Sequence, residues 1–217
     1  MGRHSDDVTR THSGIELPFL EAATRPRAGV DPNPAILFLG SWIERKGVLD
    51  LVSAMSRVFA QTPNARLSVV GCGCSSSHVL SHFLESDRHR ITTIPRVGSD
   101  SELIDIYQKH NIFVLPSYFE GQPLAMLEAA ALGLAIVTTE VCGMRDFIDH
   151  NQNGVLVAPG DSESLAAAII ALSNRPQEVR RLGSAAQINV QRFTWDAVAA
   201  DMLNAYEAAA CRQKRVA

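Results

Sequence analysis

Short apolar runs alternate with longer segments of helical period along most of the chain. Apolar runs of strand length predict six strands, at residues 36–39, 67–70, 91–94, 112–115, 134–138 and 155–157. Segments in which apolar residues recur every three to four positions predict helices at 47–60, 76–86, 101–109, 122–132, 161–173, 176–189 and 195–210. Repeated strand and helix units favour an α/β fold, in which a parallel sheet is covered by helices on both faces.

The first 34 residues do not share this alternation. They are rich in Arg, Asp, Thr and Pro, which predicts a polar arm without a core of its own. The domain proper is expected over residues 35–193, followed by a C-terminal helix and basic tail over 194–217. At 217 residues the chain is long enough for one such domain and too short for two.

Composition narrows the class of protein. Hydrophobic residues make up 46% and charged residues 20%, as in an ordinary globular protein, and a net charge of −3 disfavours nucleic-acid binding. The chain lacks the apolar run of a membrane span or a secretory signal, so we expect a cytoplasmic protein. The basic residues Arg212, Lys214 and Arg215 suit a helix C-terminus and leave a contact with the inner face of a membrane open.

The four cysteines do not predict a metal site. Cys72 and Cys74 are close in sequence, whereas Cys142 and Cys211 stand alone. This spacing matches neither a zinc knuckle nor a dense disulfide framework, so reduced thiols are the better interpretation.

Unusual residues gather in the loops that follow the predicted strands, where open parallel sheets bind their ligands. After the strand at 112–115 the loop reads Pro-Ser-Tyr-Phe-Glu-Gly-Gln-Pro and leads into a helix. Glu120 lies at that helix start, where free backbone N–H groups attract anions such as a diphosphate. A carboxylate there needs donors of its own, such as sugar hydroxyls, so the loop suggests a ligand with both phosphate and hydroxyl groups.

A second carboxylate, Glu128, shares the predicted helix face of Leu124, Leu127 and Ala131. An unpaired carboxylate in such an apolar stripe costs several kcal/mol, so a partner is expected. A local salt bridge or access to water would satisfy it as well as a ligand would.

Two cations follow the first strand. Arg45 and Lys46 lie in the loop Gly-Ser-Trp-Ile-Glu-Arg-Lys-Gly, at the carboxyl edge of the sheet. They could mark a solvated helix start beside Glu44, but cations at a helix N-terminus oppose the helix dipole. Contact with a phosphate is therefore the favoured interpretation.

These motifs together resemble family 4 glycosyltransferases, over about residues 35 to 210. Glu120 and Glu128, separated by seven residues, are similar to the family's glutamate signature. The other similar segments are Gly40 through Lys46-Gly47, Gly71-Cys72-Gly73 and Asn153 to Val157.

The resemblance implies one half of a GT-B architecture, whose later Rossmann-like domain binds the donor. It implies retaining transfer of a sugar from a nucleotide-diphosphate donor to an acceptor hydroxyl, as in polysaccharide or glycoconjugate biosynthesis, with no obligatory metal. Lys46 and Arg45 would contact the diphosphate, Glu120 would act at the donor sugar, and Glu128 would hold the ribose. The backbone amides that would bind phosphate and sugar oxygens are those around Gly121, Gln122, Pro123 and Leu124.

The chain departs from the family pattern in two places. Ser41 stands where members commonly have an arginine, a charge that Arg45 could supply from four residues later. Nothing matches the earlier, acceptor-binding domain, and residues 13–34 look like an interdomain linker. The alternative function is therefore a non-catalytic nucleotide-sugar-binding module or fragment that needs a separate acceptor domain.

Several other patterns carry less weight. Gly71-Cys72-Gly73 lacks the third glycine of a dinucleotide fingerprint, and His78 and His82 lack the glutamate of a metalloprotease motif. Arg96, after the third strand, either lies against the nucleobase or is an exposed loop arginine. A glycosidase would need its two carboxylates on opposite sides of a sugar rather than around one anion-attracting helix end.

Overall fold

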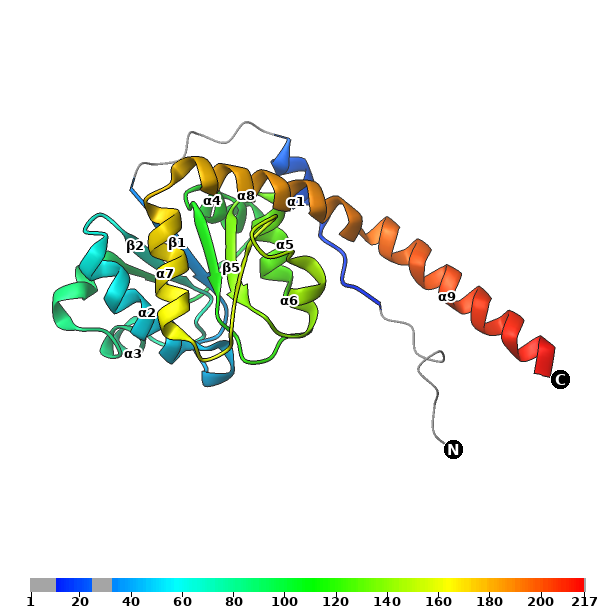
Figure 1. Ribbon diagram of the computed structural model, residues 1–217, viewed down its shortest axis with the longest axis horizontal. Coiled ribbons are helices and arrows are strands. Elements are labelled where there is room, and N and C mark those ends of the chain that lie inside the picture. The colour runs from blue at the N-terminus through cyan, green and yellow to red at the C-terminus, as the bar shows by residue number, and fades with distance from the viewer. Residues whose placement is uncertain (1–10, 25–32, 217) are drawn as a thin grey trace.

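The computed structural model describes residues 11–24 and 33–216, with residues 211–216 described by their backbone alone. Six parallel strands form one sheet in the order β3-β2-β1-β4-β5-β6 (Figure 1). The strands are β1 Ala35–Leu39, β2 Arg66–Val70, β3 Ile91–Ile94, β4 Ile112–Leu115, β5 Ala135–Thr139 and β6 Val155–Val157. The expected α/β fold is confirmed, and β5 begins and ends one residue later than predicted.

The central strands are apolar because both of their faces are covered. Every residue of β4 and β5 is buried, and Ile112 and Phe113 lie in register with Ile36 and Leu37 of β1. A parallel strand covered on two sides has no solvent-facing row, so its sequence is a continuous apolar run rather than an alternation.

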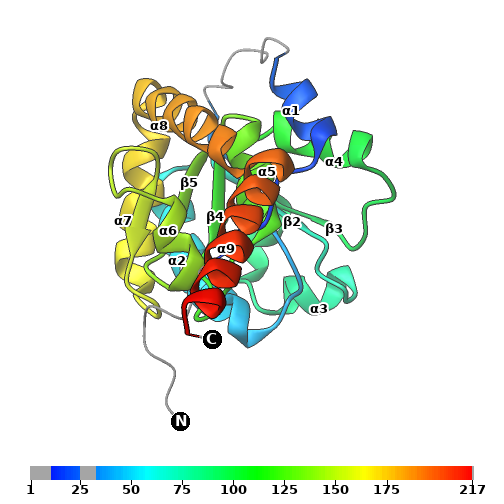
Figure 2. The same cartoon turned by 90° about the vertical axis from the view of Figure 1, so that its right-hand side faces the viewer.

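Helices cover both sides of the sheet. In Figure 2, α2 and α7 lie on one side of the strands, while α1, α4 and α5 lie on the other. The helices are α1 Leu17–Ala23, α2 Val48–Gln61, α3 Ser76–Ser81, α4 Asp100–Gln108, α5 Leu124–Ala131, α6 Cys142–Phe147, α7 Ser162–Ser173, α8 Pro176–Asn189 and α9 Trp195–Val216. Three 3-10 helices, η2 Glu44–Lys46, η3 Glu85–Arg90 and η4 Val190–Phe193, complete the elements of the described residues.

Three helical segments differ most from the prediction, and α9 also continues to Val216 rather than ending at residue 210. The helix expected at 76–86 ends at Ser81, and a separate 3-10 helix follows because the backbone of Leu84 leaves the helical region (φ −56°, ψ 141°). Helix α6 was not predicted, since six residues that include a glycine show no readable period. Helix α1 was not predicted either.

Helix α1 attaches part of the expected arm to the domain. Phe19 and Ala22 are buried, and the Phe19 ring meets the Tyr107 ring edge to face at 6.2 Å. The backbone N–H of Ile15 donates to the carbonyl of Phe193 (2.8 Å). The described part of the arm therefore packs on the core of the domain, while residues 1–10 and 25–32 of the arm lie outside the described residues.

Helix α9 extends away from the body of the protein (Figure 1). Its Tyr206 is 67% exposed. In the described part of the chain, no helix is both long enough and apolar enough to cross a membrane. The side chains of Cys211, Arg212, Lys214 and Arg215 lie outside those described, so the expectations for them stay predictions.

The strand order reverses between β1 and β4. From β1 the sheet is built outward through β2 and β3 on one side, and from β4 through β5 and β6 on the other. The connections after β1 and β4 therefore lead to helices on opposite faces of the sheet (Figure 2), and this reversal point is the place where such sheets bind ligands.

Candidate functional site

The loops that follow β1 and β4 are fastened to each other at this reversal point. Gly47 adopts a left-handed conformation (φ +68°), and any side chain there would overlap the backbone carbonyl of Pro116. The N–H of Tyr118 donates to the carbonyl of Arg45 (2.9 Å). A glycine is needed at 47 because only a residue without Cβ allows the two loops to approach this closely.

This approach gathers three predicted site residues into one ion cluster. Lys46 Nζ lies 2.5 Å from Glu120 Oε1, and Arg45 Nη1 lies 3.5 Å from the same oxygen. The Ser117 hydroxyl also donates to that oxygen (3.1 Å), and Arg45 Nη1 donates to the carbonyl of Phe119 (2.8 Å). Glu120 is only 8% exposed, so its negative charge is balanced within the protein.

An apolar pocket of about 620 Å³ opens beside this cluster, at the carboxyl ends of the first three strands. The Lys46 side chain lies against Gly40, directly after β1. The pocket and the ion cluster are therefore adjacent. Arg96 is exposed at the rim of the pocket. The lining residues are Leu39, Val70, Gly71, Gly73, Cys74, Pro95, Arg96, Val97 and Leu103.

Among the described residues, Glu128 takes no part in the ion pairs of this cluster and is hydrogen-bonded to α4 instead. Its Oε2 accepts a hydrogen bond from the Tyr107 hydroxyl (2.7 Å), and the same hydroxyl lies 3.0 Å from the carbonyl oxygen of Ala125. Burial raises the pKa of the Glu128 carboxyl, and the charges of Asp100 and Glu16 add to that rise, while the Tyr107 hydrogen bond opposes it. Burial also raises the pKa of Tyr107, which is therefore a neutral donor.

The pKa of Glu128 also responds to a residue at the carboxyl edge of the sheet. The carboxylate that most raises its pKa through charge, Asp100, is the first residue of α4, directly after the loop that follows β3. Leu103 of the apolar pocket lies one helical turn before Tyr107 on the same face of α4. The predicted apolar stripe of α5 is wrong at Leu124, which is exposed because it opens the helix at the mouth of the site.

A second and more polar cleft, of about 750 Å³, lies beside Gly121 and Gln122, the two residues that follow Glu120. Gln122 lines it, accepting a hydrogen bond from the Ser13 N–H at Oε1 (2.7 Å), whereas its Nε2 is buried with no partner among the described residues. Pro123 supplies no side-chain cap to α5, so the first N–H groups of that helix remain for water or a ligand. The lining residues are Thr11, His12, Ser13, Gly121, Gln122, Cys142, Gly143, Arg145 and Asp146.

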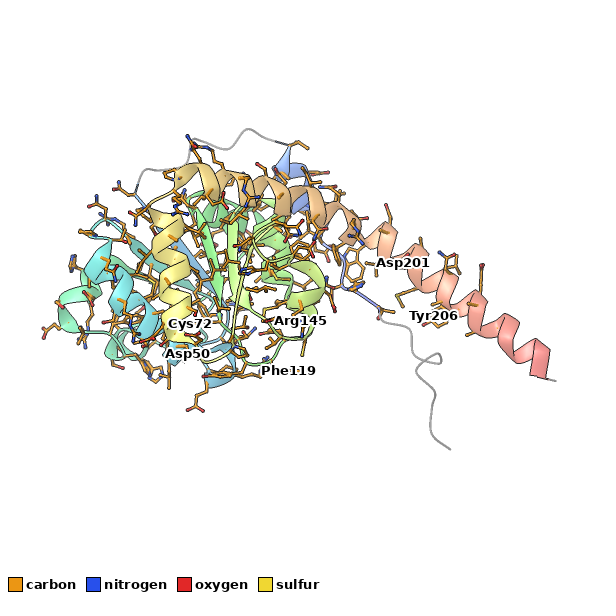
Figure 3. All side chains as sticks on the ribbon, in the orientation of Figure 1. Asp50, Cys72, Phe119, Arg145, Asp201 and Tyr206 are labelled. Atoms are coloured by element: carbon orange, nitrogen blue, oxygen red, sulfur yellow. The ribbon has the colours of Figure 1, made fainter. Side chains whose placement is uncertain are left out.

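Sequence reasoning missed the wall of this cleft. A side chain at Gly143 would overlap the carbonyl of Gly121, so helix α6 lies against the loop that follows Glu120. Figure 3 places Phe119 and Arg145 on the same side of the body. A glycine two residues after a strand loop was the available signal for this close approach. Tyr107 was also missed, because an aromatic residue on a helix is usually a core residue.

The geometry thus unites Arg45, Lys46 and Glu120, and puts Gly121 and Gln122 beside them. Within the described ranges, no group of three or more His, Cys, Asp or Glu side chains could hold a metal ion. His78 is exposed and His82 half-buried, and their rings meet edge to face at 5.1 Å. Cys72, Cys74 and Cys142 are free thiols in the described part of the chain.

Comparisons with known proteins bear on this site. The sequence profile of the family described as "Glycosyl transferases group 1" matches residues 33–175. A glycogen synthase of Mycobacterium tuberculosis is 32% identical over 211 residues, which cover 94% of this chain and 49% of the relative. The chain spans about half the length of the curated relatives it matches.

Solved structures share the fold. The sucrose-phosphate synthase of Thermosynechococcus elongatus is 28% identical, with a TM-score of 0.69, over 92% of this chain and 50% of that chain. Anabaena Alr3699/HepE, solved in complex with UDP-glucose, is 20% identical with a TM-score of 0.65, over 82% of this chain and 49% of its own.

Proposed function

The chain belongs to the group 1 glycosyltransferases, and we propose that it is the donor-binding part of a retaining enzyme, which holds a nucleotide-diphosphate sugar while the glycosyl group passes to an acceptor hydroxyl. The observation that carries this proposal is the convergence of Lys46, Arg45 and Glu120 at the reversal point of the sheet. Two cations and one carboxylate suit a ligand that has both a diphosphate and sugar hydroxyls.

The nucleoside occupies the apolar pocket of about 620 Å³ in this proposal. Pro95, Val97 and Leu103 offer apolar walls for a planar base, and the Arg96 guanidinium stacks on it or pairs with its edge. Glu128 accepts from the ribose hydroxyls through Oε1, since Tyr107 already donates to Oε2. Because the pocket lies beside Lys46, a nucleoside bound in it would present its diphosphate to the ion cluster.

The diphosphate then meets the ion cluster. Lys46 and Arg45 supply positive charge, and the N–H groups at the start of α5, around Gly121 to Leu124, donate to phosphate and sugar oxygens. As the bond between sugar and diphosphate breaks, negative charge grows on the leaving group, and these fixed cations stabilise it. With these cations in place, stabilisation of the leaving group does not require a divalent metal in this proposal.

Glu120 acts on the donor sugar. Each contact that the described residues make with its carboxylate uses Oε1, which leaves Oε2 for a sugar hydroxyl or the positive charge at the reacting carbon. The sugar extends toward the polar cleft of about 750 Å³, where Gln122 Nε2, which has no hydrogen-bond partner among the described residues, offers a further donor.

A second candidate function is a nucleotide-sugar-binding module that needs a separate acceptor domain. The exposed Phe119, at 60%, and Leu124, at 45%, are apolar groups at the mouth of the site that an acceptor domain would cover.

A transfer assay separates the two candidates. The chain is incubated with UDP-, GDP- and ADP-glucose, and release of the nucleoside diphosphate and of glycosylated product is followed. Turnover by the chain alone contradicts the module function, whereas donor binding without turnover supports it. Failure to bind any of the three donors contradicts both. UDP-glucose is included because the Anabaena protein of the same fold was solved with it.

A further inference from the structure

Two thiols in the loop after β2 lie within reach of each other. This loop reads Gly71-Cys72-Gly73-Cys74. The Cys72 thiol donates to the carbonyl oxygen of Cys74 (3.3 Å), and it lies close enough to the Cys74 thiol to raise the pKa of that thiol. Cys72 is buried, whereas Cys74 is partly exposed and lines the apolar pocket.

The backbone between the thiols is bent. Gly73 is left-handed (φ +69°), and a Cβ there would meet nothing within 4 Å. An extended chain would separate the flanking Cα atoms by about 7 Å, the upper limit for a disulfide. The bend at Gly73 shortens that separation, and the open space around the glycine lets the loop adjust as a bond forms.

The same loop supports the site. The carbonyl of Cys72 accepts from the N–H of Trp42 (2.9 Å), and the N–H of Gly40 donates to the carbonyl of Val70 (2.9 Å). Trp42 and Gly40 belong to the loop that carries Arg45 and Lys46. A change of conformation at Cys72 therefore reaches both the wall of the apolar pocket and the loop of the cations.

We propose that Cys72 and Cys74 form a thiol–disulfide exchange site, which small-molecule disulfides oxidise to a reversible Cys72–Cys74 disulfide that weakens nucleotide binding in the adjacent pocket. The part that concerns nucleotide binding rests on the proposed function. Desolvation and the contact with Cys72 raise the pKa of the Cys74 thiol, so a smaller fraction of it is thiolate at neutral pH and its exchange with a disulfide is slowed.

The reaction balances with oxidised glutathione as the oxidant. Cys74, the more exposed thiol, loses its proton to solvent and attacks one sulfur of the glutathione disulfide, which releases one glutathione thiolate. Cys72 then loses its proton and attacks the mixed disulfide at the Cys74 sulfur, which releases the second glutathione. The protein is oxidised by two electrons, and one glutathione disulfide becomes two thiols.

The first measurement is mass spectrometry after incubation of the full chain with oxidised glutathione. Both cysteines fall in one tryptic peptide, residues 67–88, so closure appears as the loss of two hydrogens from that peptide. We expect this loss in the wild-type protein and in Cys142→Ser, reversal by dithiothreitol, and no loss in Cys74→Ser. An unchanged peptide 67–88, or a disulfide that maps to Cys142 or Cys211, overturns the proposal.

The second measurement is the affinity of the same oxidised and reduced wild-type samples for UDP, GDP and ADP. We expect oxidation to weaken binding about tenfold, and oxidised Cys74→Ser to bind as its untreated form does. Equal affinity of closed and open wild-type protein overturns the coupling to the pocket. If the reduced protein binds no nucleotide, the proposed function fails, while the mass measurement still decides whether the exchange site exists.

Discussion

The Lys46 ammonium lies 2.5 Å from Oε1 of Glu120, so two side chains expected to bind different parts of one donor neutralise each other. Both are largely withdrawn from solvent. A diphosphate that reaches Lys46 must share or replace this ion pair, which ties the affinity for the nucleotide to the charge of Glu120.

Glu120→Gln is expected to separate binding from chemistry. The amide keeps a hydrogen-bond acceptor for Ser117 but frees Lys46 and Arg45 for the diphosphate, so nucleoside-diphosphate affinity should rise about fivefold, the equivalent of roughly 1 kcal/mol. Glycosyl transfer should be lost. Isothermal titration measures the affinity, with Glu163→Gln, which breaks the exposed pair with Arg57, as the control. Weaker binding by Glu120→Gln would mean that Glu120 holds the cations in place rather than competing for them.

Lys46→Ala is expected to lower nucleoside-diphosphate affinity by about tenfold to a hundredfold, because a charge-assisted contact with the diphosphate is lost. Lys109→Ala removes an equal charge from an exposed position after α4 and should leave the affinity unchanged. Titration of both variants under the same salt conditions checks this, and equal affinities would remove Lys46 from the site.

Tyr107→Phe is expected to destabilise the fold by about 1–3 kcal/mol, because the partly buried Glu128 carboxylate loses its donor. Tyr206→Phe removes the same hydroxyl from an exposed position of α9 and should change the free energy of unfolding by less than about 0.5 kcal/mol. Urea denaturation measures both. A loss in Tyr107→Phe no greater than in the control would show that the hydrogen bond does not support Glu128.

The stability of the protein should depend on pH through Glu128. Its pKa is raised in the folded state, so the folded protein holds that proton more tightly than the unfolded chain does. The free energy of unfolding should therefore fall as pH rises from the ordinary pKa of a glutamate through the raised one. Glu128→Gln removes this contribution, so the variant should gain stability relative to wild type as pH rises from about 4 through the raised pKa of Glu128. A difference that stays constant across this range would contradict the raised pKa.

The sequence predicted the sheet well because parallel strands such as Ile112–Leu115 are buried on both faces and therefore apolar throughout. It also predicted that Arg45, Lys46 and Glu120 reach one edge of the sheet, since strand ends fix that edge. It could not predict their mutual ion pairing, which depends on the close approach of two distant loops at Gly47. Helix α1 escaped prediction because only its docking on the core stabilises so short a helix.

The central claim is that the chain binds a nucleotide-diphosphate donor, and titration of the isotope-labelled, folded chain with UDP, GDP and ADP by NMR tests it most directly. At least one nucleotide should cause saturable shifts of the Gly40, Gly47 and Gly121 amide signals, and Lys46→Ala should reduce them at equal concentration. A folded wild-type chain whose amide signals remain unmoved by all three nucleotides would contradict the account.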